Sequence, residues 1–360
     1  MAATEVQKKG GSAVYYAGID YHKRYSVVSI QDAQGQIVQE QRVDHQFPEV
    51  FKRLFRECRE PVSLVYESTL NWGWLYEILE PADNVASITL ANPFKVRLIA
   101  EAEIKTDKIS ARALATLLRL NVVPACHIPD RQTRQRKEVL RQRSYWVKLR
   151  TAVRCRVHKI LGNQHDLSMP QVTDLFGRKG RAALDKALLP APDATLLAQN
   201  LRVLDAIDKE IGTDEQLIRQ EGQADRASQI LASMPGLGLI LANVIATETD
   251  GIGRFGRSER YTGYSGLSPT VHSSGGKTHM GRMMQQCNRW LKWAYIEAAW
   301  IAVGCSPYFG GLYRYHRGRG KQANTAITIV ARRMCHIAYQ LLTEDRLYQE
   351  RSFSPAALLK

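Results

Sequence analysis

The stretch Gly18-Ile19-Asp20 decides how the N-terminal part of this chain folds, because an aspartate closes an otherwise apolar run. A second apolar run, Val62-Ser63-Leu64-Val65-Tyr66-Glu67, also closes on an acid. Asp107 then opens a segment with helical spacing. Asp20 and Glu67 therefore end predicted strands, which is where the active sites of open sheets gather.

The residues up to about 123 alternate short apolar runs with amphipathic ones. Strands are predicted over 14–19, 26–30, 36–43, 62–66 and 86–91, and helices over 51–56, 72–79 and 110–120. Three closely connected strands followed by strands separated by helices is the order of an RNase H-like mixed sheet. We therefore expect an α/β, RNase H/RuvC-like domain over residues 1–128.

The three acids suit a metal centre. Two divalent cations about 4 Å apart need several carboxylates from different elements, because hard oxygen ligands bind Mg²⁺ and offset its charge. Asp20, Glu67 and Asp107 meet this requirement, although each one alone reads equally as a surface acid. The trio predicts Mg²⁺-dependent phosphodiester chemistry.

The composition favours a polyanionic partner. The 360 residues include 50 Lys and Arg against 35 acids, a formal charge of +15. No apolar stretch reaches the roughly 18 residues of a membrane span, and residues 1–12 lack the apolar core of a signal peptide, so a cytoplasmic, nucleoid-associated protein is expected. Six scattered cysteines form no C-x-x-C pair and are expected to be reduced and mostly buried.

A basic helical arm is expected over residues 129–228. Residues 131–159 hold eleven Lys or Arg against the single acid Glu138, and an apolar stripe runs along them through Val139, Trp146, Leu149, Val153, Val157 and Ile160. A second helix is expected over 201–218, and the pair suits an antiparallel coiled coil that dimerises and binds nucleic acid, or simply two helices packed on the flanking domains. The candidate nucleic-acid contacts here are Arg134, Arg141, Arg143, Arg150 and Arg154.

A mostly helical domain is expected over residues 229–360. Its turn Gly236-Leu237-Gly238 either holds a phosphate, as in a helix-hairpin-helix, or has glycine for steric reasons. Ser273-Ser274-Gly275-Gly276-Lys277 carries hydroxyls on a small-residue turn. An amphipathic helix is expected over 323–342. Further candidate phosphate contacts are Lys277, Arg282, Arg317 and Arg319, each with the alternative of a solvated loop charge.

Together these segments resemble the IS110 family of insertion-sequence transposases over nearly the whole chain. The N-terminal resemblance rests on Gly-Ile-Asp-Tyr-His-Lys at 18–23, Tyr66-Glu67-Ser68, Asn92-Pro93 and Lys105-Thr106-Asp107-Lys108-Ile109. The C-terminal resemblance rests on Pro235-Gly236-Leu237-Gly238, Tyr264-Ser265-Gly266-Leu267-Ser268-Pro269, residues 273–277, Gly281 with Asn288, and Glu297-Ala298-Ala299-Trp300.

The resemblance implies RNA-guided recombination of donor and target DNA by a homo-oligomer, a dimer or tetramer. In this chain it makes Ser274 the nucleophile that joins covalently to DNA, and Asp20, Glu67 and Asp107 the Mg²⁺ ligands. The guide is a structured RNA from the element, a bridge RNA, which we expect the helices near 131–159 to hold.

Two departures from the family pattern keep other functions open. Ser110 stands where the family has its fourth acid, and Gln285 and Cys287 stand where it commonly has Lys and Gly. One alternative is a metal-dependent Holliday-junction resolvase or nuclease in which water attacks. The other is a catalytically impaired relative that still binds nucleic acid.

Overall fold

The computed structural model describes residues 15–99, 106–164, 172–274 and 276–355. The predicted polar N-terminus, Val14, Lys105 and Gly275 lie outside these ranges. The chain divides into two compact units, residues 1–128 and 129–360. Among the described helices, none combines the length and apolar character needed to cross a bilayer.

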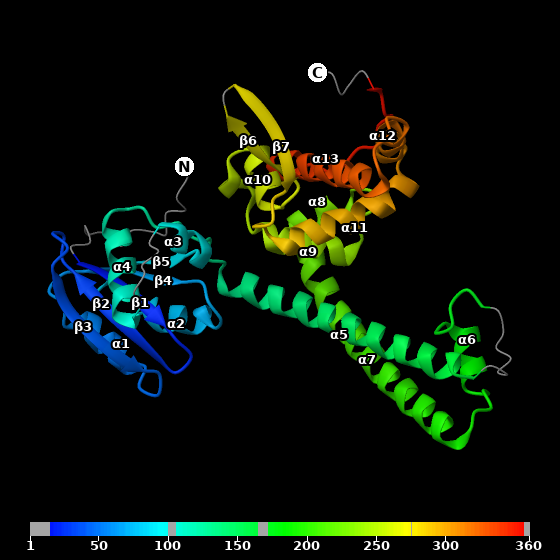
Figure 1. Cartoon of the computed structure of the whole chain (residues 1–360), viewed down its shortest axis with the longest axis horizontal. Coiled ribbons are helices and arrows are strands. Elements are labelled where there is room, and N and C mark those ends of the chain that lie inside the picture. The colour runs from blue at the N-terminus through cyan, green and yellow to red at the C-terminus, as the bar shows by residue number, and fades with distance from the viewer. Residues whose placement is uncertain (1–14, 100–105, 165–171, 275, 356–360) are drawn as a thin grey trace. The chain divides into compact units, whose positions relative to one another are not determined.

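The first unit is built on a five-stranded mixed sheet (Figure 1). Its strands are β1 (Tyr15–Tyr21), β2 (Tyr25–Gln31), β3 (Ile37–Asp44), β4 (Val62–Glu67) and β5 (Val85–Ala91). The spatial order is β3-β2-β1-β4-β5; β1 to β3 are antiparallel neighbours, whereas β1, β4 and β5 run parallel. All five predicted strands are present, with bounds shifted by one or two residues.

Helices cover both faces of this sheet. They are α1 (Glu49–Arg56), α2 (Trp72–Leu79), α3 (Pro93–Ile99) and α4 (Asp107–Arg119). Ile19 points to a buried core that includes Phe51 of α1 and Leu75 of α2. Because side chains alternate along a strand, Gly18 and Asp20 point to the opposite face, which α4 covers.

Gly18 allows α4 to lie directly on β1. A Cβ atom at Gly18 would stand 2.0 Å from the Ala111 carbonyl oxygen and 2.5 Å from the Ala115 nitrogen, both backbone atoms of α4. The predicted helix is present and begins earlier, at Asp107, where the Thr106 hydroxyl accepts a hydrogen bond from the Ile109 N–H. The missing side chain at Gly18 therefore brings the first turn of α4 to the end of β1.

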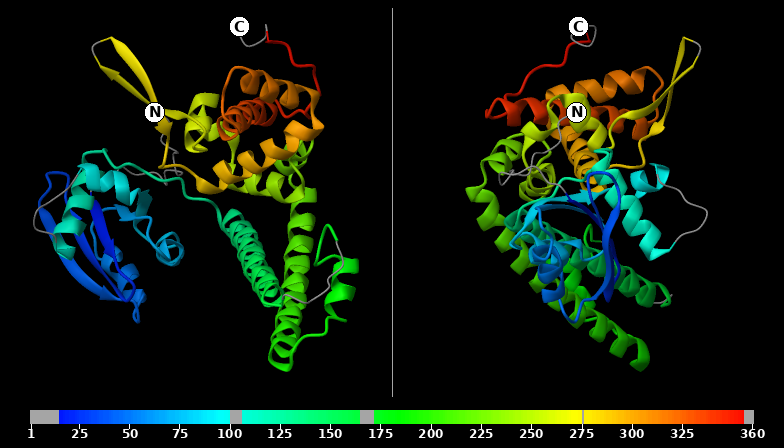
Figure 2. Two further views of the ribbon diagram at one scale, coloured as in Figure 1. Left: turned by 45° about the vertical axis from the view of Figure 1, so that its right-hand side comes forward. Right: turned by 90° about the vertical axis from the view of Figure 1, so that its left-hand side faces the viewer.

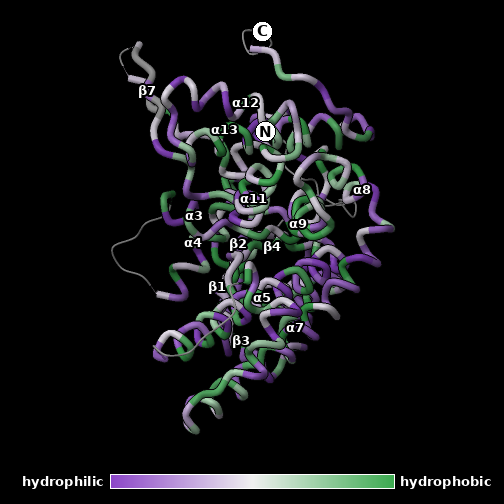
Figure 3. The backbone as a smooth tube through the Cα atoms, turned by 90° about the vertical axis from the view of Figure 1, so that its right-hand side faces the viewer, coloured by the Kyte–Doolittle hydropathy of each residue, from purple (hydrophilic) through white to green (hydrophobic). Residues whose placement is uncertain are grey.

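The second unit begins with a long helical pair, α5 (Arg131–Gly162) and α7 (Ala191–Ala224), with α6 (Arg178–Leu184) between them in sequence. Figure 2 shows α5 and α7 side by side, and Figure 3 shows hydrophilic and hydrophobic residues alternating along both. The predicted apolar positions of α7, Leu204, Ile207, Ile211 and Ile218, are buried. On α5, Leu140 is buried in place of the predicted Val139, which is half-buried.

Ion pairs fix the register of these two helices. Arg136, Arg143 and Arg150, spaced seven residues apart on α5, pair with Glu221, Glu215 and Asp208 of α7 at 3.7, 2.6 and 3.2 Å. The α5 numbers rise as the α7 numbers fall, so the helices are antiparallel. Basic residues of α5 that the sequence assigned to nucleic acid thus face acids of the same chain.

The rest of the second unit is helical apart from one hairpin (Figure 1). The elements are α8 (Arg226–Ala232), α9 (Leu239–Thr249), the 3₁₀ helix η1 (Ile252–Phe255), α10 (Ser258–Tyr264), β6 (Pro269–Ser274), β7 (Lys277–Met283), α11 (Arg289–Cys305), α12 (Pro307–Gly318) and α13 (Ala323–Thr343). One large apolar core includes buried residues from α9, α11 and α13. The prediction that the thiols are mostly buried is wrong, since only Cys335 of the six is buried.

The turn before α9 has a steric reason for glycine. Gly236 has φ of +83°, and a Cβ there would stand 2.2 Å from the Ala298 carbonyl oxygen of α11. The glycine therefore permits a left-handed backbone and close helix packing at once. This accounts for the residue without a phosphate, whose binding at this turn stays a prediction.

Candidate functional site

Asp20, His22 and Asp107 converge at the end of β1. Each offers one ligand atom, and these atoms all lie within 4.8 Å of one another. The Nε2 atom of His22 is 3.5 Å from Oδ2 of Asp20 and 3.3 Å from Oδ1 of Asp107. The three side chains are 23%, 37% and 42% exposed, so a metal ion or a phosphate could reach them from solvent.

Tyr25 holds this cluster together from the start of β2. Its hydroxyl donates a 2.9 Å hydrogen bond to Oδ2 of Asp107, and its ring lies against the imidazole of His22 with centroids 4.8 Å apart. The hydrogen bond to Asp107 raises the pKa of Tyr25, because the carboxylate stabilises the protonated phenol. The carbonyl of Tyr25 also accepts the His22 backbone N–H at 3.0 Å.

Glu67 is the third predicted metal ligand, and Ser110 stands where a fourth acid was expected. Ile19 and Tyr66 are register partners on the parallel strands β1 and β4, so Asp20 and Glu67 follow as neighbours on the α4 face of the sheet. Glu67 is half-buried there and lies outside the tight group of Asp20, His22 and Asp107. Ser110, half-buried, lies one helical turn beyond Asp107.

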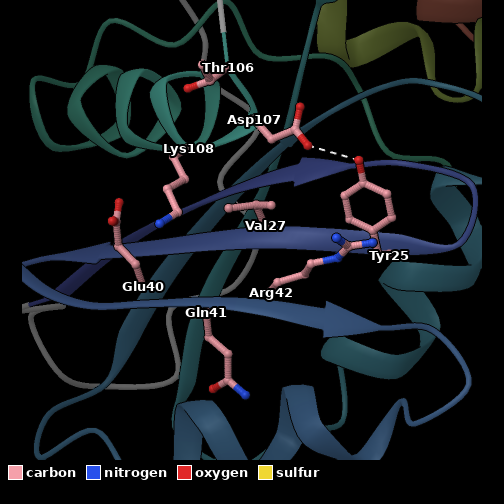
Figure 4. A pocket seen from close by; sticks show the side chains of 8 residues that line it. All are labelled: Tyr25, Val27, Glu40, Gln41, Arg42, Thr106, Asp107 and Lys108. Atoms are coloured by element: carbon pink, nitrogen blue, oxygen red, sulfur yellow. Dashed lines mark hydrogen bonds between the residues drawn. The ribbon is translucent and has the colours of Figure 1, made fainter.

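A cavity of about 620 Å³ adjoins Asp107 (Figure 4). Its lining residues are Tyr25, Val27, Glu40, Gln41, Arg42, Thr106, Asp107 and Lys108. The Arg42 guanidinium stacks 3.8 Å over the Tyr25 ring. Arg42 and Lys108 bring two cations to a cavity that begins at the carboxylate cluster, an arrangement that suits a phosphate near a metal.

One acid of this cavity has a structural partner. Both oxygens of Glu40, on β3, accept hydrogen bonds from Arg112 of α4 at 2.6 and 2.7 Å. Hydrogen bonding from Arg112 lowers the pKa of Glu40. The pair connects the outer strand to the helix that carries Asp107.

Ser274 lies in the other unit, at the tip of the β6–β7 hairpin. It is exposed, and its Cα pairs across the turn with Lys277. The turn includes Gly276 with φ of +76°. His279 and Arg282 of β7 are exposed, while the side chain of Lys277 lies outside the described part of the chain.

A buried polar cluster supports the base of this hairpin. Asn288 caps α11 by accepting hydrogen bonds from the N–H groups of Trp290 and Leu291. Its amide donates to Glu248 at 2.9 Å, a residue only 6% exposed. Glu248 also contacts Lys137 at 3.4 Å and Arg141 at 3.1 Å, both on α5. The long helix is thereby tied to the core beneath the hairpin.

The remaining arginines predicted to bind nucleic acid have partners within the chain. Arg134 donates to the Pro129 carbonyl at 3.0 Å, and the Arg154 guanidinium stacks 4.9 Å over Phe176. Arg317 donates to the Lys321 carbonyl, and Arg319 to the Tyr315 hydroxyl, although both arginines are exposed. Their contact with nucleic acid stays a prediction.

Four residues of the first centre were not predicted from the sequence. His22, Tyr25, Arg42 and Lys108 surround the predicted carboxylates. His22 could have been found, because it follows Asp20 by two residues at a strand end. Arg42 could not, because its place depends on the pairing of β3 with β2, in which Arg42 faces Val27.

Two family models of transposases match different parts of this chain. A family model described as "Transposase IS116/IS110/IS902 family" matches residues 228–314, and a DEDD transposase model of IS110 elements matches residues 17–165. A "Probable family 20 transposase" of Pseudomonas aeruginosa is 25% identical over 283 residues, which is 71% of this chain and 79% of that protein.

Two proteins of insertion elements match over shorter stretches. An IS900 protein of Mycobacterium paratuberculosis is 28% identical over 46% of this chain and 41% of its own length. An IS110 protein of Streptomyces coelicolor is 30% identical over 36% of this chain and 32% of its own length. The DEDD model covers the unit that carries the carboxylates and continues through α5, and the other model covers the part of the second unit that includes Ser274. In both parts the chain is similar to transposases of the IS116/IS110/IS902 family.

Proposed function

We propose that this protein is the transposase of an insertion sequence, which cuts and rejoins DNA strands with an RNase H-like carboxylate centre and a serine nucleophile. The observation that carries the proposal is the Asp20, His22 and Asp107 cluster beside the cavity lined by Arg42 and Lys108. Acids that converge from separate elements beside a cavity that two cations line suit a metal-dependent phosphodiester site.

The residues of the first centre fit a divalent cation such as Mg²⁺. Asp20, Glu67 and Asp107 would hold it, and a bound cation would supply charge stabilisation at the phosphate. Tyr25 orients the Asp107 carboxylate, and Arg42 and Lys108 would hold the phosphates of the strand. Donor and target DNA are the proposed substrates.

Ser274 would provide the covalent step. Its Oγ attacks a DNA phosphorus, one phosphodiester P–O bond breaks, and the proton lost by the serine ends on the released nucleotide oxygen. In rejoining, a nucleotide hydroxyl attacks the serine phosphodiester, and Ser274 leaves with a proton. The exposed hairpin tip supports this role, because an accessible hydroxyl can meet a DNA backbone without prior opening of the fold.

The experiment that tests this is a strand-cleavage assay on element-end DNA with Mg²⁺, resolved on a denaturing protein gel. The parent is expected to form a covalent protein–DNA adduct, and Ser274→Ala to form none while binding DNA almost normally, since one hydroxyl and no charge is removed. Ser273→Ala is the matched control and should keep the adduct. An adduct that survives Ser274→Ala and disappears in Ser273→Ala would move the nucleophile by one residue.

A structured guide RNA and a homo-oligomer are part of the same proposal. The net charge of +15 supports a large polyanionic partner, and two duplexes must be cut in one exchange. If recombination persists after ribonuclease treatment, the activity does not need a guide RNA, and that part of the proposal is wrong.

The carboxylate cluster equally favours one other activity, hydrolysis by a metal-dependent resolvase or nuclease. In that case water attacks, and Ser274 has only a structural role. Cleavage of a branched DNA without any adduct, unchanged in Ser274→Ala, would support it. DNA binding without cleavage would instead support the impaired relative that Ser110 suggested.

A further inference from the structure

His22 stands where a metal ligand is expected, between two carboxylates. Its Nε2 atom is buried and makes no hydrogen bond to any described residue, although it lies 3.5 and 3.3 Å from oxygens of Asp20 and Asp107. A buried nitrogen so close to two acids, and unsatisfied by either, is costly unless another species binds it. A cation at the centre of the three atoms would give this nitrogen a partner.

The spacing of these atoms suits one octahedral ion. Ligands at about 2.0–2.1 Å from an ion stand about 3 Å apart when they occupy adjacent octahedral positions. The two distances from Nε2 are slightly longer than this. Small side-chain shifts would close the difference.

The imidazole is also held in place. The backbone N–H of His22 donates to the Tyr25 carbonyl at 3.0 Å, and the imidazole ring lies against the Tyr25 ring. The same tyrosine hydrogen-bonds to Asp107. Tyr25 therefore positions both candidate ligands, one through its ring and one through its hydroxyl.

We propose that His22 is a nitrogen ligand of the catalytic cation, so that the site prefers a first-row transition ion such as Mn²⁺ over Mg²⁺. The inference rests on the proposed function and changes its metal. Imidazole binds first-row transition ions well and Mg²⁺ poorly, whereas carboxylates bind both. Ser110 brings no charge to the centre, so the set is poorer in acids and richer in nitrogen than four carboxylates would be.

The direct test is pulsed electron paramagnetic resonance of Mn²⁺ bound to the full chain without DNA. A directly bound imidazole gives a ¹⁴N coupling in the echo modulation. We expect this coupling in the parent and in His45→Gln, and its loss in His22→Gln. His45 is the matched control, because it lies in the same unit but stacks on Tyr21 and is not part of the carboxylate cluster.

Metal affinity gives a second measurement. His22→Gln is expected to weaken Mn²⁺ about 10-fold or more and Mg²⁺ much less, so that the selectivity for Mn²⁺ falls. Ser110→Asp is expected to tighten both ions, because it adds charge without changing the nitrogen.

The outcomes separate the two proposals. Mn²⁺ that binds in an Asp20-dependent manner without ¹⁴N coupling, or with coupling that survives His22→Gln, overturns the role of His22 and leaves the carboxylate centre intact. Binding that is unaffected by Asp20→Asn overturns the metal centre itself.

Discussion

The two candidate centres differ in how much buried packing supports them. Asp20, Glu67 and Asp107 project from strands and a helix that share buried cores and a common sheet. Ser274 projects from a two-stranded hairpin whose tip is exposed, and Val271 beside it is 57% exposed. An isolated two-stranded ribbon is marginally stable in water. The fold thus fixes the carboxylates more firmly than the exposed hydroxyl of Ser274.

This difference predicts how packing substitutions in each unit affect the candidate centre of that unit. A packing change in the first unit should displace ligands and reduce metal binding. If Ser274 is the nucleophile, a packing change near the hairpin should leave its hydroxyl reactive but alter how bound DNA orders it. Four experiments can break or sharpen this contrast.

The largest effect is expected from Asp20→Asn or Glu67→Gln. Each removes a formal charge from a centre already without an acid at position 110, so Mg²⁺- or Mn²⁺-dependent cleavage should fall by about 100-fold or more. Asp83→Asn is the control, since Asp83 is an 80% exposed acid of the same unit. Normal cleavage by Asp20→Asn across a metal titration would contradict the carboxylate centre.

Gly18→Val should test whether packing alone sets the carboxylates. The new side chain would meet the backbone of α4, so we expect about 1–3 kcal/mol lower stability and weaker metal binding, measured by unfolding and by calorimetry. Gly212→Ala, in α7 with open space around it, should leave metal binding unchanged. Equal metal affinity in Gly18→Val and the parent would mean that α4 need not touch β1.

The long arm separates packing cations from binding cations. Arg143→Gln and Arg150→Gln remove ion pairs with α7, so we expect lower thermal stability, whereas Lys148→Gln removes an exposed charge of α5. If the solvent face of α5 binds nucleic acid, Lys148→Gln should flatten the salt dependence of binding by about one slope unit. If Arg143→Gln and Arg150→Gln flatten the salt dependence and Lys148→Gln does not, the paired arginines bind the nucleic acid instead.

The smallest effect concerns pH. The folded pKa of Glu40 is below its ordinary value of 4.5, so the stabilisation from its pair with Arg112 is complete above that pH and is lost as the pH falls through the lowered pKa. Arg112→Gln should therefore lower the melting temperature slightly near pH 7, because the Arg112 side chain is partly exposed. The difference from the parent should shrink as the pH falls through the lowered pKa of Glu40. A constant difference between the two proteins across that range would assign the effect to packing.

The strands and the positions of the candidate metal ligands were predictable because they depend on local patterns. Apolar runs ending in Asp20 and Glu67 place both acids at strand ends whatever the sheet order. The helix α3 was missed, although Asn92 followed by Pro93 is a start signal and the Asn92 side chain accepts from the Lys95 N–H. The partners of the α5 arginines could not be predicted, because they depend on the register between helices about 70 residues apart.

The three ion pairs between α5 and α7 also keep the two ends of this helical arm at a constant spacing. The 32 residues of α5 span about 48 Å, the length of about 14 base pairs of duplex. Slippage by one helical turn would separate all three pairs at once, so the arm keeps one length while it is folded. The cluster of α6 with the far ends of α5 and α7 is therefore held at a set distance from the helical core under the hairpin. A nucleic acid that contacts both ends of this arm must therefore present its two contact points at that fixed distance.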